Sequence, residues 1–381
     1  THIANMSPEH GGGEQQPLKF SQHDNNVLIV FLDRFMGGFV EDILQDEPQL
    51  LTRLDGFIWY PLSISAGTNS IAGVHPIFGG YDYTPLEMNA RDLLLRDVSA
   101  ESFAILPLNF TAHGYQANVV NPHGLGFTMN GDCSYLNFDN VNCAHVPLTV
   151  TKELAERMGV PLTTLSKSNY GDLLVLLSAM RAATYSMKAV LSARGPWRAA
   201  MDHSAGSTFR QWAELKSLPV LTTTDSDQSN YNQIFNILPH EPYFLDENCM
   251  PKERALVRTA DQLKDLGYKS LFAYQHAIAA RCSLLLVSDY FEWMKEAGVY
   301  DNTKIVIVSD HGIIGPVLDR SSRAERGGTI KNKFVQSRSV LFVKERDAHG
   351  ALDISERFMP NAEVPRIVCQ EIGGCVNPFL G

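Results

Sequence analysis

Two runs of apolar residues stand out in the hydrophobic pattern of the chain, at 27–32 and at 304–309. Such runs are typical of strands that are buried on both faces of a parallel sheet. Longer stretches with helical spacing lie between them. Strands that alternate with long helices predict an α/β fold, in which helices flank both faces of a mostly parallel central sheet.

The same pattern predicts the further elements of this fold. We expect shorter strands at 57–60, 115–120, 235–238 and 339–343. We expect helices at 39–54, 170–191, 253–266, 268–297 and 364–372, and one that follows a turn at 65–70 and ends at 78. The predicted domain covers 25–381, with a flexible lead-in at 1–24 and an irregular insertion around 121–230.

Composition and charge narrow the class of protein. The chain has 381 residues, of which 44% are hydrophobic, and this is an ordinary globular composition. Its net charge of −10 argues against nucleic-acid binding, because proteins that bind phosphate backbones concentrate Lys and Arg. No apolar run approaches the roughly 20 residues that cross a bilayer. The chain begins with Thr1 rather than Met, so we expect it to be the soluble portion of a longer protein.

The six cysteines leave two arrangements open. Their number is even and none forms a CxxC pair, which argues against a zinc ribbon. In the first arrangement, two pairs close short loops and the remaining two cysteines pair by elimination: Cys133–Cys143, Cys369–Cys375 and Cys249–Cys282. The alternative is six independent thiols, as in a cytosolic enzyme.

Both apolar runs end in residue types that bind metals. Asp33 follows the run at 27–32, and Asp310 and His311 follow the run at 304–309. In open parallel sheets, ligands bind beyond the carboxyl ends of the strands. Two carboxylates and an imidazole suit a divalent ion such as Zn²⁺ or Mn²⁺. The alternative is that each aspartate only caps a helix.

Further candidates for the chemistry lie in three other segments. Thr68 precedes a predicted helix, and the backbone N–H groups at a helix start favour an incoming phosphate. Its hydroxyl is therefore the candidate nucleophile, and the alternative is that Thr68 is only the N-cap of the helix. His240 follows the strand at 235–238, and its alternative is a structural loop role. A basic group follows His311 and either meets an anionic substrate or forms a solvated loop: Arg320, Arg323, Arg326, Lys331 and Lys333.

The segments that carry these residues, at 27–33, 65–73, 236–243 and 299–312, resemble in this order the alkaline phosphatase/sulfatase superfamily. They look most like its membrane-anchored branch, the phosphoethanolamine transferases and the lipoteichoic-acid-synthase-like phosphoglycerol transferases. The resemblance implies an alkaline phosphatase-like fold and a divalent metal, with Zn²⁺ as first choice and Mn²⁺ or Mg²⁺ as alternatives.

The resemblance also implies a role for each matching residue. The metal ligands would be Asp33, Thr68, Asp310 and His311, with Asp33 in a position where the transferases usually have Glu. Thr68 would be the nucleophile that becomes covalently loaded, and His240 would contact the transferred phosphoryl group. Three basic residues would contact the anionic substrate: Arg34, Lys331 and Lys333.

The implied reaction transfers phosphoethanolamine or phosphoglycerol from a phospholipid donor to an envelope glycan or lipid acceptor, through a covalent intermediate on Thr68. The implied location is the periplasmic, extracytoplasmic face of the bacterial inner membrane. We expect a monomer that is attached to the membrane through a segment missing from this chain and that binds no nucleic acid.

The sequence departs from the family pattern at two places. No Pro or Arg follows Thr68 in the sulfatase pattern, which argues against a formylglycine sulfatase. The stretch 313–343 contains no histidine, although the transferases usually have one there, and it carries Lys331 and Lys333 instead. Two alternatives therefore accompany the transferase: a phosphodiesterase or phosphatase with the same site, and a non-catalytic member that binds a lipid or a partner.

Overall fold

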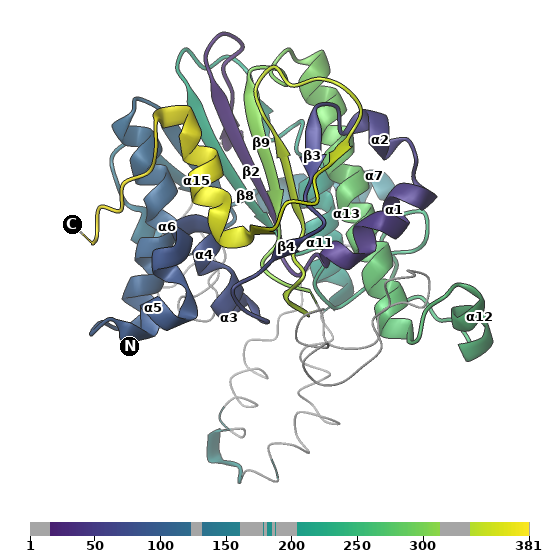
Figure 1. The fold of residues 1–381 in the computed structure, drawn as a ribbon. Coiled ribbons are helices and arrows are strands. Elements are labelled where there is room, and N and C mark those ends of the chain that lie inside the picture. Colours follow the sequence, from purple (N-terminus) through teal and green to yellow (C-terminus); the bar gives the residue numbers. More distant parts are fainter. Residues whose placement is uncertain are drawn as a thin grey trace.

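The computed structural model describes residues 16–122, 132–160, 178, 181–184, 187, 204–312 and 336–380. An eight-stranded sheet lies at its centre (Figure 1), in the order β11-β3-β10-β9-β2-β8-β5-β6. Five neighbouring strands are parallel: β9 (Thr303–Val308), β2 (Asn26–Leu32), β8 (Asn230–Asn236), β5 (Gln116–Val120) and β6 (Val141–Ala144). The prediction of a mostly parallel sheet is confirmed.

The other edge of the sheet contains the antiparallel strand. Strand β10 (Leu341–Lys344) runs antiparallel to β9 and to β3 (Phe57–Trp59), and β11 (Asp353–Ile354) pairs in parallel with β3. Two small sheets lie outside this one. They are formed by β1 (Leu18–Lys19) with β7 (Thr222–Thr223), and by β4 (Ser63–Ile64) with β12 (Met359–Pro360).

Helices cover both faces of the sheet because the side chains of β2 are buried on both sides. Leu28, Val30 and Leu32 belong to one apolar core, and the alternating residues Val27, Ile29 and Phe31 belong to the other. The first core includes residues of α1 (Val40–Asp46), α2 (Leu50–Arg53), α7 (Leu148–Met158), α11 (Ser204–Lys216) and α13 (Leu271–Glu296). The second includes residues of α4 (His75–Gly79), α6 (Leu95–Ala112) and α15 (Val364–Val368) (Figure 1).

Helix α13 is the longest described element and lies in the first core. By length and composition it is the one helix among the described residues that could cross a membrane. However, 72% of its most apolar window is buried inside the protein. It therefore has the properties of a core helix, as the spacing at 268–297 predicted.

The lead-in predicted at 1–24 is too long. Strand β1 pairs with β7, and Leu18 and Phe20 are fully buried. The residues before 25 that the structure describes are thus part of the fold, because two apolar side chains there reach the first core. Residues 1–15 lie outside the described part.

The segment expected to be an insertion, 121–230, partly builds the main fold. It supplies the edge strand β6, which pairs with β5, and helices α7 and α11, which pack on the first core. Residues 123–131 and most of 161–203 lie outside the described part, and with them most of the helix expected at 170–191.

Several element boundaries differ from those expected. The helix at 39–54 is divided into α1 and α2 around Pro48, which cannot continue a helix interior. The helix at 253–266 is only α12 (Ala260–Asp265), because Thr259 caps it in a capping box with Gln262. Strand β8 begins at Asn230, earlier than expected, since its polar residues are buried as well. Helix α6 was not predicted and contains Pro107 in its interior.

Of the two cysteine arrangements that the sequence leaves open, the structure has the paired one. Disulfides join residues 10, 33 and 6 positions apart in sequence: Cys133–Cys143, Cys249–Cys282 and Cys369–Cys375. Three disulfides in one chain are typical of a protein that matures in an oxidising compartment.

Candidate active site

The carboxyl ends of β2 and β9 bring Asp33, Asp310 and His311 together. The two strands pair in parallel up to Phe31 and Val308, so the residues that follow lie at the same edge of the sheet. Each of the three side chains offers one ligand atom, and these atoms all lie within 4.8 Å of one another. All three residues are buried, with at most 5% of their surface exposed. This arrangement is called the acidic cluster below.

The electrostatics of the acidic cluster favour a cation. Burial and the neighbouring Asp310 raise the pKa of Asp33 well above its ordinary value. Asp310 Oδ1 accepts a hydrogen bond from the backbone N–H of Arg34 at 2.8 Å. Asp310 Oδ2 is buried 3.3 Å from His311 Nε2 but makes no hydrogen bond within the described part of the chain. A divalent ion would compensate both carboxylates, so these residues fit the metal that the sequence predicts.

The orientation of His311 also suits this role. Its Nδ1 lies within hydrogen-bond distance of the Gly312 carbonyl oxygen. A carbonyl can only accept, so Nδ1 carries the proton and Nε2 keeps its lone pair. Nε2 is the atom that faces Asp310 and the cluster. A backbone partner on the far nitrogen is typical of histidines that bind metals.

The structure places a hydroxyl in the acidic cluster that the sequence did not single out. Ser70 Oγ lies 3.3 Å from Asp33 Oδ1 and 3.3 Å from His311 Nε2. Ser70 is the first residue of α3 (Ser70–Gly73), and the Asn69 side chain caps this helix by accepting from Ala72 N–H at 3.0 Å. The cap sets the helix start two residues after Thr68, at the residue whose hydroxyl reaches the cluster.

Thr68 lies in the turn that precedes α3 and is half-buried. Its carbonyl oxygen accepts a hydrogen bond from the side chain of Gln336. This contact involves its backbone, so the role of its hydroxyl as the nucleophile stays a prediction. Both Thr68 and Ser70 precede the same apolar run, and local spacing alone does not distinguish them.

Arg34 connects the acidic cluster to the loop after β8. Its backbone adopts the left-handed region, at φ 64°, and its guanidinium forms an ion pair with Glu241. Arg34 Nη1 lies 3.4 Å from Nε2 of His240, whose Nδ1 in turn lies 2.7 Å from the Glu241 carbonyl oxygen. His240 and Arg34 therefore lie side by side, and their role as substrate contacts stays a prediction. Lys331 and Lys333 lie outside the described residues.

His276 contacts the backbone of Arg34, and the sequence did not predict this contact. Its Nε2 lies 2.9 Å from the Arg34 carbonyl oxygen, to which it donates. Its ring stacks on Tyr243 at 5.5 Å and meets the edge of Phe39 at 5.0 Å. Burial and the positive charge of Arg34 lower the pKa of His276 to about 3, so the imidazole stays neutral. Its position inside an apolar helix gives no sequence signal of this contact.

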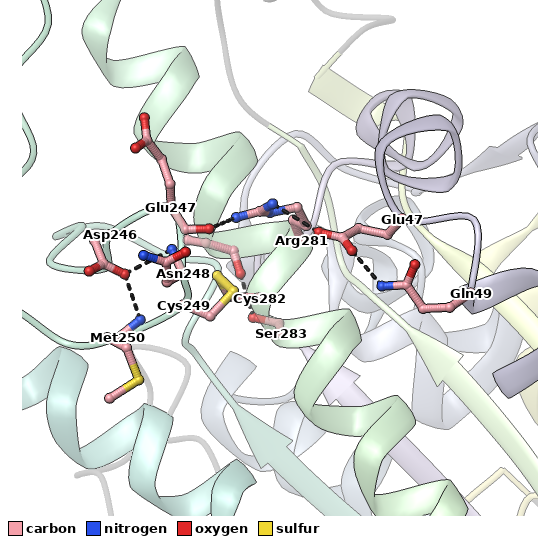
Figure 2. Close-up of a disulfide and its surroundings, with 11 residues drawn as sticks. Glu47, Gln49, Asp246, Glu247, Asn248, Cys249, Met250, Arg281, Cys282 and Ser283 are labelled. Atoms are coloured by element: carbon pink, nitrogen blue, oxygen red, sulfur yellow. Dashed lines mark hydrogen bonds and ion pairs between the residues drawn. A yellow bond between two sulfur atoms is a disulfide. The ribbon is translucent and has the colours of Figure 1, made fainter. Parts of the chain in front are cut away.

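A disulfide fastens the loop that carries His240 (Figure 2). Cys249, in that loop, is bonded to Cys282 in α13. Beside the sulfur atoms, Arg281 of α13 donates to the Glu247 carbonyl oxygen and pairs with Glu47 at 2.9 Å. The loop is thus held at both ends, by β8 and by this disulfide.

Comparison with known proteins identifies the fold. No family model matches the sequence, and no curated protein sequence matches it significantly. The structure is similar to that of the phosphonate monoester hydrolase SpPMH from Silicibacter pomeroyi, with a TM-score of 0.50 and 14% identity over 93% of this chain and 74% of that one. The fold is alkaline phosphatase-like, as the sequence predicts.

Two further solved structures are similar to this one, with lower TM-scores. They are the lipoteichoic acid synthase LtaP from Listeria monocytogenes and the C-terminal periplasmic domain of EcEptC from Escherichia coli. Each is 11% identical to this chain, with TM-scores of 0.47 and 0.46. The alignments cover 91% and 93% of this chain, and 72% and 83% of those proteins.

Proposed function

We propose that this protein is a metal-dependent phosphoryl-transfer enzyme in which Ser70 is the nucleophile. The observation that carries the proposal is the position of the Ser70 hydroxyl, at hydrogen-bond distance from both Asp33 and His311. A nucleophilic hydroxyl needs a group that takes its proton, and Ser70 donates to Asp33 Oδ1. Zn²⁺, or else Mn²⁺ or Mg²⁺, held by Asp33, Asp310 and His311, would supply Lewis-acid stabilisation of the negative charge.

The proposed phosphoryl transfer has two steps. In the first, a bond forms between Ser70 Oγ and phosphorus, the bond from phosphorus to the leaving alcohol breaks, and the serine proton passes by way of Asp33 to the leaving alcohol. In the second, the hydroxyl oxygen of an acceptor bonds to phosphorus, the bond from phosphorus to Ser70 Oγ breaks, and the acceptor's proton passes by way of Asp33 to Ser70. We assign the orientation of the anionic phosphoryl oxygens to Arg34 and His240, and their proximity supports this role, since a guanidinium pairs well with phosphate.

For the substrates, we propose a phospholipid donor of phosphoethanolamine or phosphoglycerol and an envelope glycan or lipid acceptor. The resemblance of the segments at 27–33, 65–73, 236–243 and 299–312 to the membrane-anchored transferases supports this choice. The three disulfides support a periplasmic location, where thiols are oxidised. Membrane attachment through a further segment and a monomeric state belong to the same proposal.

A hydrolase with the same site is the second candidate. The similarity of the fold to a phosphonate monoester hydrolase favours it. The chemistry differs only in the second step, where water replaces the acceptor hydroxyl. Product analysis with and without a glycan acceptor separates the two reactions.

The assignment of the nucleophile is tested with the variants Ser70→Ala and Thr68→Val. With p-nitrophenyl phosphate esters and Zn²⁺ or Mn²⁺, we expect S70A to lose about 10³-fold or more of kcat while it keeps its bound metal. T68V, which keeps the shape of threonine, retains activity within about tenfold. Intact mass after mixing with substrate locates the covalent adduct. If T68V loses both the activity and the covalent adduct while S70A keeps both, Thr68 rather than Ser70 is the nucleophile. Metal-free wild type at full activity refutes the proposal.

A further inference from the structure

The helix that begins at Ser70 lies directly against the backbone of Asp310. Gly73 is in its first turn and donates its N–H to the Asn69 carbonyl oxygen at 2.8 Å. A Cβ atom at Gly73 would lie 2.7 Å from the Asp310 carbonyl oxygen and 2.7 Å from Ser65 Oγ, closer than non-bonded carbon and oxygen atoms approach. The missing side chain therefore allows the helix with the hydroxyl to approach the strand end with the carboxylate.

A single buried side chain bridges these two backbones. Asn361 Nδ2 lies 3.2 Å from the carbonyl oxygen of Gly73 and 3.4 Å from that of Asp310. Both partners are acceptors, so only the NH₂ group of the amide satisfies them. The side chain is fully buried, so these carbonyls have no access to water as a replacement.

Asn361 comes from a distant part of the sequence that is fixed beside the site. It begins the short 3-10 helix η6 (Asn361–Glu363), directly after β12. Strand β12 pairs in parallel with β4, in the register Met359 to Ser63. Strand β4 is the strand that leads into the turn before Ser70. The same pairing thus holds both the start of the Ser70 segment and the residue that bridges to Asp310.

We infer that Asn361 is a positioning residue that sets the distance between Ser70 and the acidic cluster. Its two bonds join the first turn of α3 to the residue that supplies a carboxylate, while its own contacts are with backbone atoms. Loss of the bridge leaves two buried carbonyls without donors, and the helix and the Asp310 backbone are then free to separate. Partners in this outer layer of a metal site typically change metal affinity or activity by about 10- to 100-fold. The inference rests on the proposed function.

The chain offers a matched control for this residue. Asn109 in α6 is also buried, and its Nδ2 also bridges two carbonyl oxygens, those of Ile105 and Val376, at 2.8 Å each. Its partners lie in α6 and in the segment near the C-terminus, and neither of them belongs to the acidic cluster. Asn109 Oδ1 also accepts a hydrogen bond from the Val376 N–H at 2.8 Å. The variants Asn361→Leu and Asn109→Leu therefore each remove a buried amide that bridges two carbonyl oxygens, and the control loses one hydrogen bond more.

The experiment measures Zn²⁺ affinity by competition with a chromophoric chelator, and kcat on a p-nitrophenyl phosphate ester at saturating metal. We expect N361L to weaken Zn²⁺ binding or lower kcat by about 10- to 100-fold, and N109L to stay within about twofold in both. Both variants lose thermal stability. Equal affinity and equal kcat in the two variants overturn the inference.

If N361L does not fold, the variant Asn361→Ser is used in its place, because the serine hydroxyl keeps one hydrogen-bond donor. The Zn²⁺ affinity and kcat of N361S are then compared with those of N109L, and this comparison decides the role of Asn361. Wild-type protein that binds neither Zn²⁺ nor Mn²⁺ overturns both the proposed function and this inference. Wild-type protein that binds metal without turnover overturns the function alone, and the Zn²⁺ affinities of N361L and N109L then decide the role of Asn361.

Discussion

Removal of the Cys249–Cys282 disulfide should destabilise the protein more than removal of Cys369–Cys375. The perturbation is a double alanine variant of each pair, C249A/C282A and C369A/C375A. The two pairs are closely matched in environment, because Cys282 and Cys369 are fully buried and Cys249 and Cys375 are half-buried. The loss of buried sulfur thus contributes similarly to both variants.

The magnitude follows from the length of chain that each bond closes. The cysteines lie 33 residues apart in one pair and 6 in the other. A cross-link removes loop entropy from the unfolded chain, which amounts to about 4 kcal/mol for the longer loop and about 2 kcal/mol for the shorter one. The difference of about 1.5 kcal/mol depends only on the ratio of the two lengths.

The assay is urea unfolding followed by circular dichroism, after mass spectrometry confirms that the other two disulfides are formed. The free energy of unfolding in water should fall by about 4 kcal/mol in C249A/C282A and by about 2 kcal/mol in C369A/C375A. Equal losses, or a larger loss in C369A/C375A, would show that native-state contacts rather than loop length determine the effect. The reasoning from chain entropy would then be wrong.

Three further predictions concern buried groups. Burial raises the pKa of Glu214 to about 7, so the stabilisation from its protonated form is complete below the unfolded pKa of about 4.5 and is lost as the pH rises to about 7. Glu214→Gln should remove this decline, and its free energy of unfolding at pH 8, measured with urea, should exceed that of wild type by at most about 3 kcal/mol. Parallel pH profiles of the two proteins would contradict this prediction. Gly73→Ala should lower both Tm and kcat, because its Cβ would collide with the Asp310 carbonyl; an unchanged kcat counts against the close approach. A chelator should lower the Tm of wild type, and Zn²⁺ should restore it, whereas Asp310→Asn should respond to neither; an equal response of both proteins would place the metal elsewhere.

Much of the central sheet could be predicted because its strands carry a strong local signal. The residues at 27–32 and at 305–308 are all apolar, and they form most of β2 and β9, which are buried on both faces. Weaker signals failed where tertiary packing overrides local preference. Strand β8 starts with buried Asn230, and α6 continues through Pro107, so neither matched the expected pattern.

The sequence by itself determined the class of fold, and it predicted the residues of the acidic cluster and one of two arrangements of the cysteines. Asp33 directly follows β2, and Asp310 and His311 come shortly after the end of β9; parallel neighbouring strands bring such residues to one edge. Only the tertiary structure showed that the Ser70 hydroxyl reaches them, at the start of a helix that Asn69 caps. The contacts of His276 and Asn361 were likewise decided there, since hydrogen bonds to distant backbone carbonyls leave no periodic trace in the chain.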